Sequence, residues 1–238
     1  MLLKKILKNK KVDCIAIITA REGSKRIKNK NILNFFGKPM IAYSIEAAKK
    51  TKLFDQIYVS TDSLKIKKIS EKFGAIVPFL REKKLSDDFT GTQEVIKSFI
   101  NKISHNNKNF IYVCCIYPTA PLIKYKSIIL GYKEIVKNIY DYVISANIIE
   151  KFPNKFFQVK NKKIKKIYNK KNFTLRSQDM PVYFQDAGQF YWANKERWLK
   201  RKIFTSRTAV IKISNNYVQD LDNPNDLELL KFKKLNNE

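Results

Sequence analysis

The 238-residue chain has little histidine, cysteine or glycine, and each shortage excludes a class of site. Its one histidine, His105, lies in a polar stretch typical of a loop, which argues against a Ser-His-Asp triad, a histidine-based zinc site and a histidine general base. The three cysteines, Cys14, Cys114 and Cys115, lie in apolar runs typical of strands, without metal-ligand spacing or a disulfide framework. We expect buried reduced thiols, with Cys114 and Cys115 facing opposite sides of a strand.

Long apolar runs and the common nucleotide-binding glycine motifs are also missing. No stretch approaches the roughly 20 apolar residues of a membrane-spanning helix, and the start of the chain lacks the apolar segment and cleavage site of a signal peptide. We therefore expect a cytoplasmic protein without a membrane partner. Neither Gly-x-Gly-x-x-Gly nor the P-loop motif occurs, which disfavours an oxidoreductase with a Rossmann dinucleotide site.

The chain is strongly basic, with 48 basic and 21 acidic residues and a formal net charge of +27. A nucleic-acid-binding protein is one interpretation, but it requires clustered cations interleaved with aromatic residues. Only seven of the basic residues are arginines, and the lysines are spread along the chain. We expect a compositional bias and no nucleic-acid partner, with any functional positive charge serving a small anionic substrate.

Apolar runs typical of strands alternate with segments of helical periodicity. Strands are predicted at 12–20, 56–60, 75–80, 110–117 and 142–146, and helices at 39–50, 63–73, 93–103 and 127–138. This alternation predicts an α/β fold in which helices cover both faces of a mostly parallel sheet. We predict one domain over residues 1–238, with a basic N-terminal extension at 1–11.

The alternation stops between about residues 151 and 184, where short pieces alternate polar and apolar residues. This segment predicts an antiparallel hairpin or an insertion arm. Beyond it we predict strands at 188–193 and 208–213, a helical fragment at 197–200 and a helix at 224–234. Asn223 or Asp222 could cap that last helix, with Pro224 in its first turn.

The loop after the first predicted strand, Ala20–Asn31, is dense in cations and contains Gly23 and Ser24. Ligands of open α/β sheets bind at the carboxyl ends of strands, and polyphosphates need fixed positive charge, hydroxyls and exposed backbone N–H groups. On charge alone, a phosphate site and a merely basic loop both remain possible.

The detailed pattern resembles the cytidylyltransferases that make CMP-activated acidic sugars, a family that includes the N-acetylneuraminate enzymes. The resemblance begins with Ala-Arg-x-Gly-Ser-Lys-x-x-x-x-Lys-Asn at 20–31 and covers nearly the whole chain after about Val12. It includes the segments 59–62, 85–88, 117–121, 176–179 and 219–222. Within the family, the segments 78–81, 113–117 and 186–192 are most similar to the pseudaminic acid branch.

The resemblance implies a Rossmann-like three-layer nucleotide-diphospho-sugar transferase fold with an inserted antiparallel dimerisation arm. It implies transfer of CMP from CTP to the anomeric hydroxyl of a nine-carbon acidic keto-sugar, with release of pyrophosphate. It also implies Mg²⁺ as cofactor and a homodimer. Pseudaminic acid is the favoured acceptor, while legionaminic, N-acetylneuraminic and 3-deoxy-octulosonic acids remain alternatives.

Matched positions imply roles for the nucleotide-binding residues. Arg21, Lys25 and Asp222 are predicted to be catalytic, the two cations because they would neutralise charge that grows on the phosphates. Arg26 and Lys28 fall outside the matched positions and are expected to be solvent-exposed. The other predicted CTP contacts are Ser24, Lys30, Asn31, Arg81, Thr90, Thr92, Pro118 and Thr119. Asp62 could be structural or line the nucleotide pocket.

The family pattern also implies a metal site and an acceptor site. Asp220 and Asp222 are expected to hold Mg²⁺, projecting to one face at the end of a strand, with a helix-capping role as the alternative for Asp222. Tyr191 and Trp192 are expected to pack within a strand. Tyr117 and Gln185 differ from the Gln and Arg found at these positions in sialic-acid enzymes. The predicted acceptor contacts are Arg176, Gln178, Gln185, Asp186 and Gln189.

Overall fold

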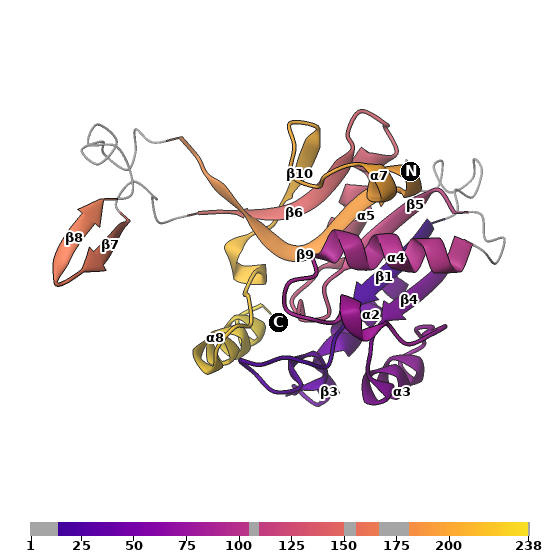
Figure 1. Cartoon of the computed structure of the whole chain (residues 1–238), viewed down its shortest axis with the longest axis horizontal. Helices are drawn as coiled ribbons and strands as arrows, with labels where there is room; N and C mark the ends of the chain where they lie inside the picture. The colour runs from indigo at the N-terminus through magenta and orange to yellow at the C-terminus, as the bar shows by residue number, and fades with distance from the viewer. Residues whose placement is uncertain (1–13, 105–109, 150–155, 167–180, 238) are drawn as a thin grey trace.

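The computed structural model describes residues 14–104, 110–149, 156–166 and 181–237, and a six-stranded sheet forms its centre (Figure 1). The strand order is β10-β6-β9-β5-β1-β4. The strands are β1 (Cys14–Thr19), β4 (Gln56–Ser60), β5 (Tyr112–Ile116), β6 (Tyr142–Ile148), β9 (Phe184–Asn194) and β10 (Thr208–Lys212).

Most strand pairs are parallel, as the alternating sequence pattern predicts. β1 pairs in parallel with β4 and β5, and β10 pairs in parallel with β6. β9 lies between β5 and β6 and is antiparallel to both. The carboxyl ends of β1, β4 and β5 therefore meet at one edge of the sheet, where α/β folds bind their ligands.

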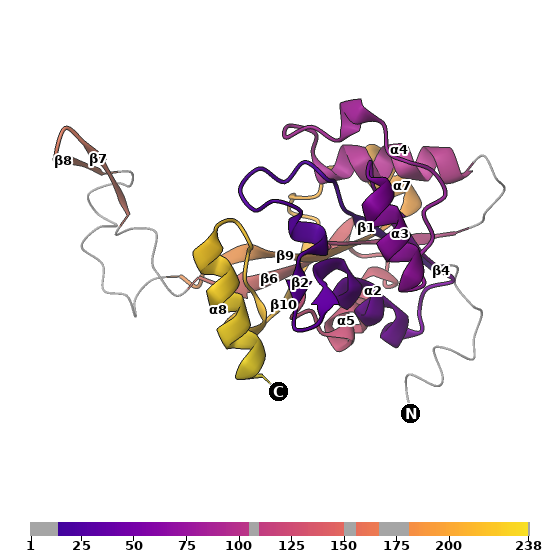
Figure 2. The ribbon, with the colours of Figure 1, turned by 90° about the horizontal axis from the view of Figure 1, so that it is seen from below.

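Helices cover both faces of the sheet, which gives three layers (Figure 2). On one face, α2 (Met40–Thr51), α3 (Leu64–Lys72) and α5 (Tyr125–Ile135) pack on a core that contains Cys114. On the other, α4 (Thr92–Ser104) and α7 (Lys195–Lys200) pack on a core that contains Cys115. The neighbouring cysteines face opposite cores as predicted, and all three cysteines are buried thiols.

The prediction of a strand at 75–80 is wrong. Only Ile76 forms a bridge, to Tyr58 of the edge strand β4, and the chain then leaves the sheet. Pro78 has no N–H to donate to a strand ladder, so the apolar run cannot extend the pairing beyond this point. The segment instead leads to Arg81, whose backbone N–H donates to the Thr61 carbonyl at 2.7 Å.

β9 is longer than the predicted strand at 188–193, and it contains a bulge at the candidate site. Its register with β6 shifts between Ile144 and Ala146, opposite Gly188, whose φ is 56°. The Ser145 hydroxyl accepts hydrogen bonds from the backbone N–H groups of Gln189 and Phe190, at 3.2 and 3.1 Å. Bulges redirect side chains beside functional sites, and across this one the Asp186 carboxylate accepts a hydrogen bond from Tyr191 of the same strand.

The predicted hairpin in the insertion is confirmed for its described part. β7 (Phe157–Lys160) and β8 (Lys163–Lys166) pair antiparallel around Asn161 and Lys162. Both turn residues have positive φ, as two-residue hairpin turns require. The hairpin stands apart from the sheet in both views (Figures 1 and 2). Its apolar residues Phe156, Phe157, Val159 and Ile164 are exposed.

The remaining elements complete the edge that carries the site. α8 (Pro224–Leu235) begins after Asn223, whose side chain caps the helix in a capping box with Asp226. The shorter elements are β2 (Asn34–Phe35), β3 (Lys38–Pro39) and the 3-10 turns η1 (Lys30–Ile32), η2 (Lys83–Leu85) and η5 (Asn215–Tyr217). Among the described residues, no helix is long and apolar enough to span a membrane. The extension at 1–11, His105, Arg176 and Gln178 lie outside the described residues.

Candidate active site

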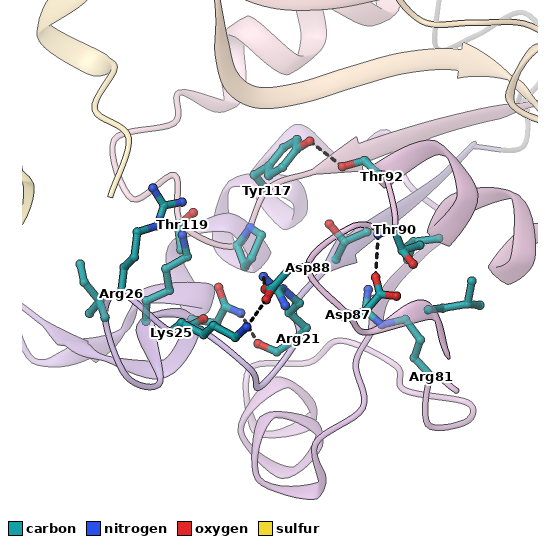
Figure 3. Close-up of a pocket in the computed structure, with 18 residues that line it drawn as sticks. Arg21, Lys25, Arg26, Arg81, Asp87, Asp88, Thr90, Thr92, Tyr117 and Thr119 are labelled. Carbon is teal, nitrogen blue, oxygen red and sulfur yellow. Dashed lines mark hydrogen bonds and ion pairs between the residues drawn. The ribbon is translucent and has the colours of Figure 1, made fainter. Parts of the chain in front are cut away.

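A pocket of about 490 Å³ opens at the carboxyl ends of β1, β4 and β5 (Figure 3). It brings together ten of the residues predicted to bind or transform the nucleotide. They are Arg21, Ser24, Lys25, Lys30, Asn31, Arg81, Thr90, Thr92, Pro118 and Thr119. The loops that follow separate strands thus converge on one cationic cavity.

The cationic loop 20–31 is held in shape from inside. The buried Asn31 side chain donates to the Arg21 carbonyl at 2.7 Å, so it braces the loop. The Asp62 carboxylate accepts a hydrogen bond from the Glu22 N–H at 2.9 Å and is not among the pocket-lining residues. Asp62 therefore has the structural role that the sequence left open.

Arg21 and Lys25 both pair with Asp88 in the middle of the pocket (Figure 3). The Arg21 guanidinium lies 2.7 Å and the Lys25 ammonium 2.5 Å from the two Asp88 carboxylate oxygens. These contacts with Lys25 and Arg21 lower the pKa of Asp88. Sequence reasoning gave Asp88 no role, although the Leu-Ser-Asp-Asp motif at 85–88 contains it. Two cations converging on one carboxylate show that this spot favours an anion.

Arg81 is a buried cation with an unused hydrogen-bond donor. Arg81 is 9% exposed. Its Nε donates to the Ser86 hydroxyl at 3.1 Å, and its Nη2 has no partner. Burial lowers the pKa of Arg81, with Asp62 opposing the shift. An unpaired buried donor carries a desolvation cost, and Arg81 is also one of the residues that line the pocket.

The loop before α4 and the residue after β5 form the opposite wall. The Asp87 carboxylate accepts from the Thr90 N–H at 2.7 Å and fixes the loop, and this bond lowers the pKa of Asp87. The Thr92 and Tyr117 hydroxyls lie 2.7 Å apart (Figure 3). Tyr117 thus presents a phenol hydroxyl at this wall of the pocket.

Arg26 and Lys30 connect the pocket to Asp222. The Arg26 guanidinium lies 2.8 Å from the Asp222 carboxylate, and the Lys30 ammonium lies 3.9 Å from it. Lys30 also donates to the Leu221 carbonyl at 3.2 Å, and burial lowers the pKa of Lys30. Arg26 was expected to be merely solvent-exposed. Its side chain is 68% exposed, yet it lines the pocket because the loop curls back toward the start of α8.

Asp220 and Asp222 flank the buried Leu221 in the segment before α8. The expectation that they end a strand is wrong, since this segment joins η5 to α8. Asn223, not Asp222, caps the helix, which leaves the Asp222 carboxylate free for ionic contacts. Partial desolvation raises the pKa of Asp220, and so do the negative charges of Asp222 and Asp186, although Asp220 remains in contact with solvent.

The two carboxylates fit Mg²⁺. Hard oxygen donors suit this ion, and Mg²⁺ is commonly held by one or two carboxylates together with substrate phosphates. No group of three or more His, Cys, Asp or Glu side chains that could hold a metal occurs in the part of the chain that is described. Partial desolvation is the main cause of the raised pKa of Asp220, the negative charges of Asp222 and Asp186 add to it, and a nearby divalent cation would offset these effects.

The predicted acceptor residues of β9 do not line the large pocket. Gln185 is exposed, while Gln189 is buried and donates to the Tyr217 carbonyl at 2.6 Å. Gln189 lines a small hollow together with Asp220. Asp186 accepts hydrogen bonds from the Gly188 N–H at 2.9 Å and from the Tyr191 hydroxyl. Tyr191 and Trp192 are buried in the sheet, as expected for strand-packing residues.

Comparison with known sequences identifies the family to which this chain belongs. The model of the cytidylyltransferase family matches residues 15–237. A pseudaminic acid cytidylyltransferase of Campylobacter jejuni is 36% identical over 226 residues, which cover 94% of this chain and 97% of that protein. An N-acylneuraminate cytidylyltransferase of Streptococcus agalactiae is 32% identical over 217 residues, which cover 89% of this chain and 51% of that protein.

Solved structures support the fold. A CMP:2-keto-3-deoxy-manno-octonic acid synthetase complexed with CTP superposes with a TM-score of 0.70 and 14% identity, over 95% of this chain and all of that one. A 4-diphosphocytidyl-2C-methyl-D-erythritol synthase superposes with a TM-score of 0.66 and 10% identity, over 94% and 98% of the two chains. The three-layer nucleotidyltransferase fold is therefore confirmed. With its family match along nearly the whole chain, this protein belongs to the cytidylyltransferases and is a nucleotidyltransferase enzyme.

Proposed function

We propose that the protein transfers CMP from CTP to the anomeric hydroxyl of a nine-carbon acidic keto-sugar, pseudaminic acid, and releases pyrophosphate. The observation that carries this proposal is one continuous polar site. A cationic pocket suited to a triphosphate is joined through Arg26 and Lys30 to a carboxylate pair suited to Mg²⁺. The reaction would use cytoplasmic CTP, and it requires neither a nucleic acid nor a membrane.

In this proposal, each kind of residue in the pocket has its own chemical role. Arg21 and Lys25 bind the triphosphate in place of their contact with Asp88 and stabilise charge on the leaving pyrophosphate. Ser24 and Lys30 add contacts to the phosphates. Arg81, which lines the same pocket, contributes a cation to the binding of the nucleotide. Catalysis then consists of positioning the acceptor hydroxyl in line with the α-phosphorus.

Asp220 and Asp222 would hold Mg²⁺ against the phosphate oxygens. The bound ion supplies positive charge that neutralises the phosphates and aligns them for displacement. Arg26 and Lys30 keep the Asp222 carboxylate turned toward the pocket. The same contacts would orient the metal-binding edge relative to the triphosphate.

The acceptor assignment rests on the relatives. The Campylobacter jejuni relative, matched along nearly its whole length, is named for pseudaminic acid. The acceptor would contact Gln185, Asp186 and Gln189 of β9, with Arg176 and Gln178 from the segment outside the described residues. Legionaminic, N-acetylneuraminic and 3-deoxy-octulosonic acids are the alternative acceptors, the second suggested by the Streptococcus agalactiae relative.

A pyrophosphate-release assay with four nucleoside triphosphates and these four acidic sugars tests the proposal. We expect activity with CTP and pseudaminic acid, dependence on Mg²⁺ and loss of activity in EDTA. Higher kcat/KM with another acidic sugar would replace the acceptor. Activity with another nucleotide and none with CTP would overturn the nucleotide assignment.

We further propose a homodimer in which the insertion arm completes the neighbouring site. The β7–β8 hairpin exposes Phe157, Val159 and Ile164, and a hairpin needs another surface to bury its apolar side. A two-fold symmetric partner would supply that surface twice. Light scattering at micromolar concentration should give the mass of a dimer, and a monomer mass would contradict the assembly.

The shared site has its own test. Two inactive variants, Asp222→Asn and Arg176→Ala, should partly restore activity when they are mixed and allowed to exchange subunits. Failure to complement in a confirmed dimer would confine each site to one chain.

A further inference from the structure

Asp220 and Asp222 lie in a segment without regular secondary structure, so side-chain contacts hold their backbone in place. The segment 218–223 joins η5 to α8 (Figure 1). The Asp220 carbonyl accepts a hydrogen bond from the Gln219 side-chain amide at 3.1 Å. The Asp222 backbone N–H donates to the Asp226 carboxylate at 2.8 Å. Each of the two proposed metal ligands therefore has a backbone group bonded to a neighbouring side chain.

The Gln219 side chain connects these two contacts. Its amide nitrogen also donates to the Asp226 carboxylate at 3.4 Å, and its amide oxygen accepts from the Lys233 ammonium at 3.2 Å. Because an ammonium can only donate, it holds the amide oxygen on its own side and turns the NH₂ group toward Asp220 and Asp226. The two hydrogens of that group match the two acceptors.

Lys233, in the last turn of α8, holds the chain just before the carboxylate pair. Its ammonium also donates to the carbonyls of Asn215 at 3.0 Å and Val218 at 2.6 Å. From the opposite side, the Gln189 side chain of β9 donates to the Tyr217 carbonyl at 2.6 Å. The backbone that leads to the carboxylates is therefore bonded to both a helix and the central sheet.

The charge of Lys233 does not favour a metal ion. A positive charge beside a divalent cation repels it, so any support that Lys233 gives to metal binding comes from its hydrogen bonds. Neither Lys233 nor Gln219 lines the nucleotide pocket. Both residues are thus placed to act on the carboxylates and not on the nucleotide directly.

We propose that Gln219 and Lys233 are positioning residues, which hold the backbone of Asp220 and Asp222 so that both carboxylates can bind one Mg²⁺. This inference rests on the proposed function, since it takes the carboxylate pair as the metal site. Loss of a group that orients metal ligands typically costs roughly ten- to hundredfold in metal affinity. The two residues should therefore affect the uptake of Mg²⁺ more than any other step.

Calorimetric titration of CTP at a series of Mg²⁺ concentrations tests the inference without an acidic sugar. The half-maximal Mg²⁺ concentration is the one that gives half of the gain in CTP affinity. Gln219→Met keeps the length of the side chain and removes its hydrogen bonds. We expect it to raise the half-maximal Mg²⁺ concentration roughly tenfold, while CTP affinity in EDTA stays at the wild-type value. An unchanged half-maximal concentration, or an equal loss of CTP affinity in EDTA, would overturn the inference.

Lys233→Met separates position from charge, because the two effects have opposite signs. Removal of a positive charge alone would strengthen Mg²⁺ binding and lower the half-maximal concentration. Loss of the bonds to the segment should raise it instead, and this is the result that we expect. A lowered value would show that Lys233 acts only through its charge and would refute its positioning role.

Lys231→Met is the matched control, because it makes the same change of side chain and charge on the same helix. Lys231 pairs with the exposed Glu228 at 2.8 Å. This variant should leave the half-maximal Mg²⁺ concentration within twofold of the wild-type value. A rise equal to that in Lys233→Met would assign the effect to α8 in general and would overturn the inference.

The double variant tests whether Gln219 and Lys233 act together. Residues of one hydrogen-bonded network are not additive, so the combined rise should be smaller than the product of the two single rises. A full product would show that the residues act separately. If CTP binding by the wild-type protein does not depend on Mg²⁺, the metal assignment of the proposed function fails, whereas wild-type dependence that is unchanged in the variants overturns only this inference.

Discussion

The proposed nucleotide side and the proposed acceptor side of the site differ in how their side chains are held. On the nucleotide side, Arg21 and Lys25 extend from a loop and pair with Asp88 through partly exposed ionic contacts. On the acceptor side, Asp186 is bound to Gly188 and Tyr191 within β9. One side is held by charges and the other by hydrogen bonds of the sheet.

This difference predicts different responses to mutation. Exposed ion pairs contribute about 0–1 kcal/mol to stability, so cations on the nucleotide side can exchange partners for a phosphate at little cost. Removing one partner of a buried hydrogen bond costs about 1–3 kcal/mol. Substitutions on the nucleotide side should therefore affect catalysis more than folding, whereas those along β9 should affect both.

The largest expected effect is that of Asp222→Asn. We expect turnover in the pyrophosphate-release assay to fall roughly a thousandfold, because loss of one carboxylate weakens the metal site and leaves phosphate charge uncompensated. The thermal midpoint should change little, since Asn223 and not Asp222 caps α8.

Asn223→Ala should have the opposite effect, a loss of stability with little loss of activity. It should cost about 1 kcal/mol of stability, the usual effect of losing a helix cap, while turnover stays within a few-fold of wild type. Wild-type turnover in Asp222→Asn would refute the metal assignment.

The second comparison is between two arginines of the same loop. Arg21→Ala should lower kcat/KM for CTP by about 2–4 kcal/mol, the scale of one preorganised electrostatic contact. Arg26→Ala should do much less, because its side chain is 68% exposed and pairs with Asp222 at the rim. Steady-state kinetics at saturating acceptor measures both, and equal losses would mean that the loop is only generically basic.

The nucleotide side could be predicted from the sequence in most respects. A continuous apolar strand followed by a loop rich in cations is a local signal, and the same holds for the loops that carry Arg81, Thr92 and Pro118. Parallel strands place such loops at one edge of the sheet. The prediction missed the role of Asp88 and the ion pair of the exposed Arg26 with Asp222, because charge pairing across loops leaves no periodic signal.

The acceptor side could be predicted only in part. Residues of β9 were assigned to the acceptor without distinguishing the exposed Gln185 from the buried Gln189. Their directions depend on the bulge at Gly188 and on pairing with β6, which are properties of the folded sheet. The false strand at 75–80 has a similar cause, since an apolar run alone does not show where pairing stops.

Arg81→Lys tests a residue of the nucleotide side that is buried, unlike the partly exposed cations Arg21 and Lys25. Lysine keeps the positive charge but lacks the planar guanidinium, whose Nε donates to the Ser86 hydroxyl and whose Nη2 has no partner. Calorimetry should show CTP binding weakened by about 0.5–1.5 kcal/mol, the net value of one hydrogen bond, together with a lower thermal midpoint. Arg201→Lys, at an exposed position, should change neither, and unchanged CTP binding in Arg81→Lys would remove Arg81 from the nucleotide contacts.

The smallest expected effect is that of Asp88→Asn on the stability of the free protein. Lys25 and Arg21 lower the pKa of Asp88 in the folded state below its ordinary value of 3.8. A lowered pKa stabilises the fold above pH 3.8, and the stabilisation is lost as the pH falls through the folded value. The variant should therefore show a slightly lower thermal midpoint at pH 7, and the difference from wild type should vanish on acidification and shrink in high salt.

Asp87→Asn is the matched control. Asp87 accepts hydrogen bonds from the backbone N–H groups of Phe89 and Thr90, and an asparagine oxygen can accept the same bonds. The effect of this control substitution should not depend on salt. A difference in Asp88→Asn that persists in 1 M salt would show that hydrogen bonds, and not charges, hold the nucleotide side, and would remove the contrast between the two sides of the site.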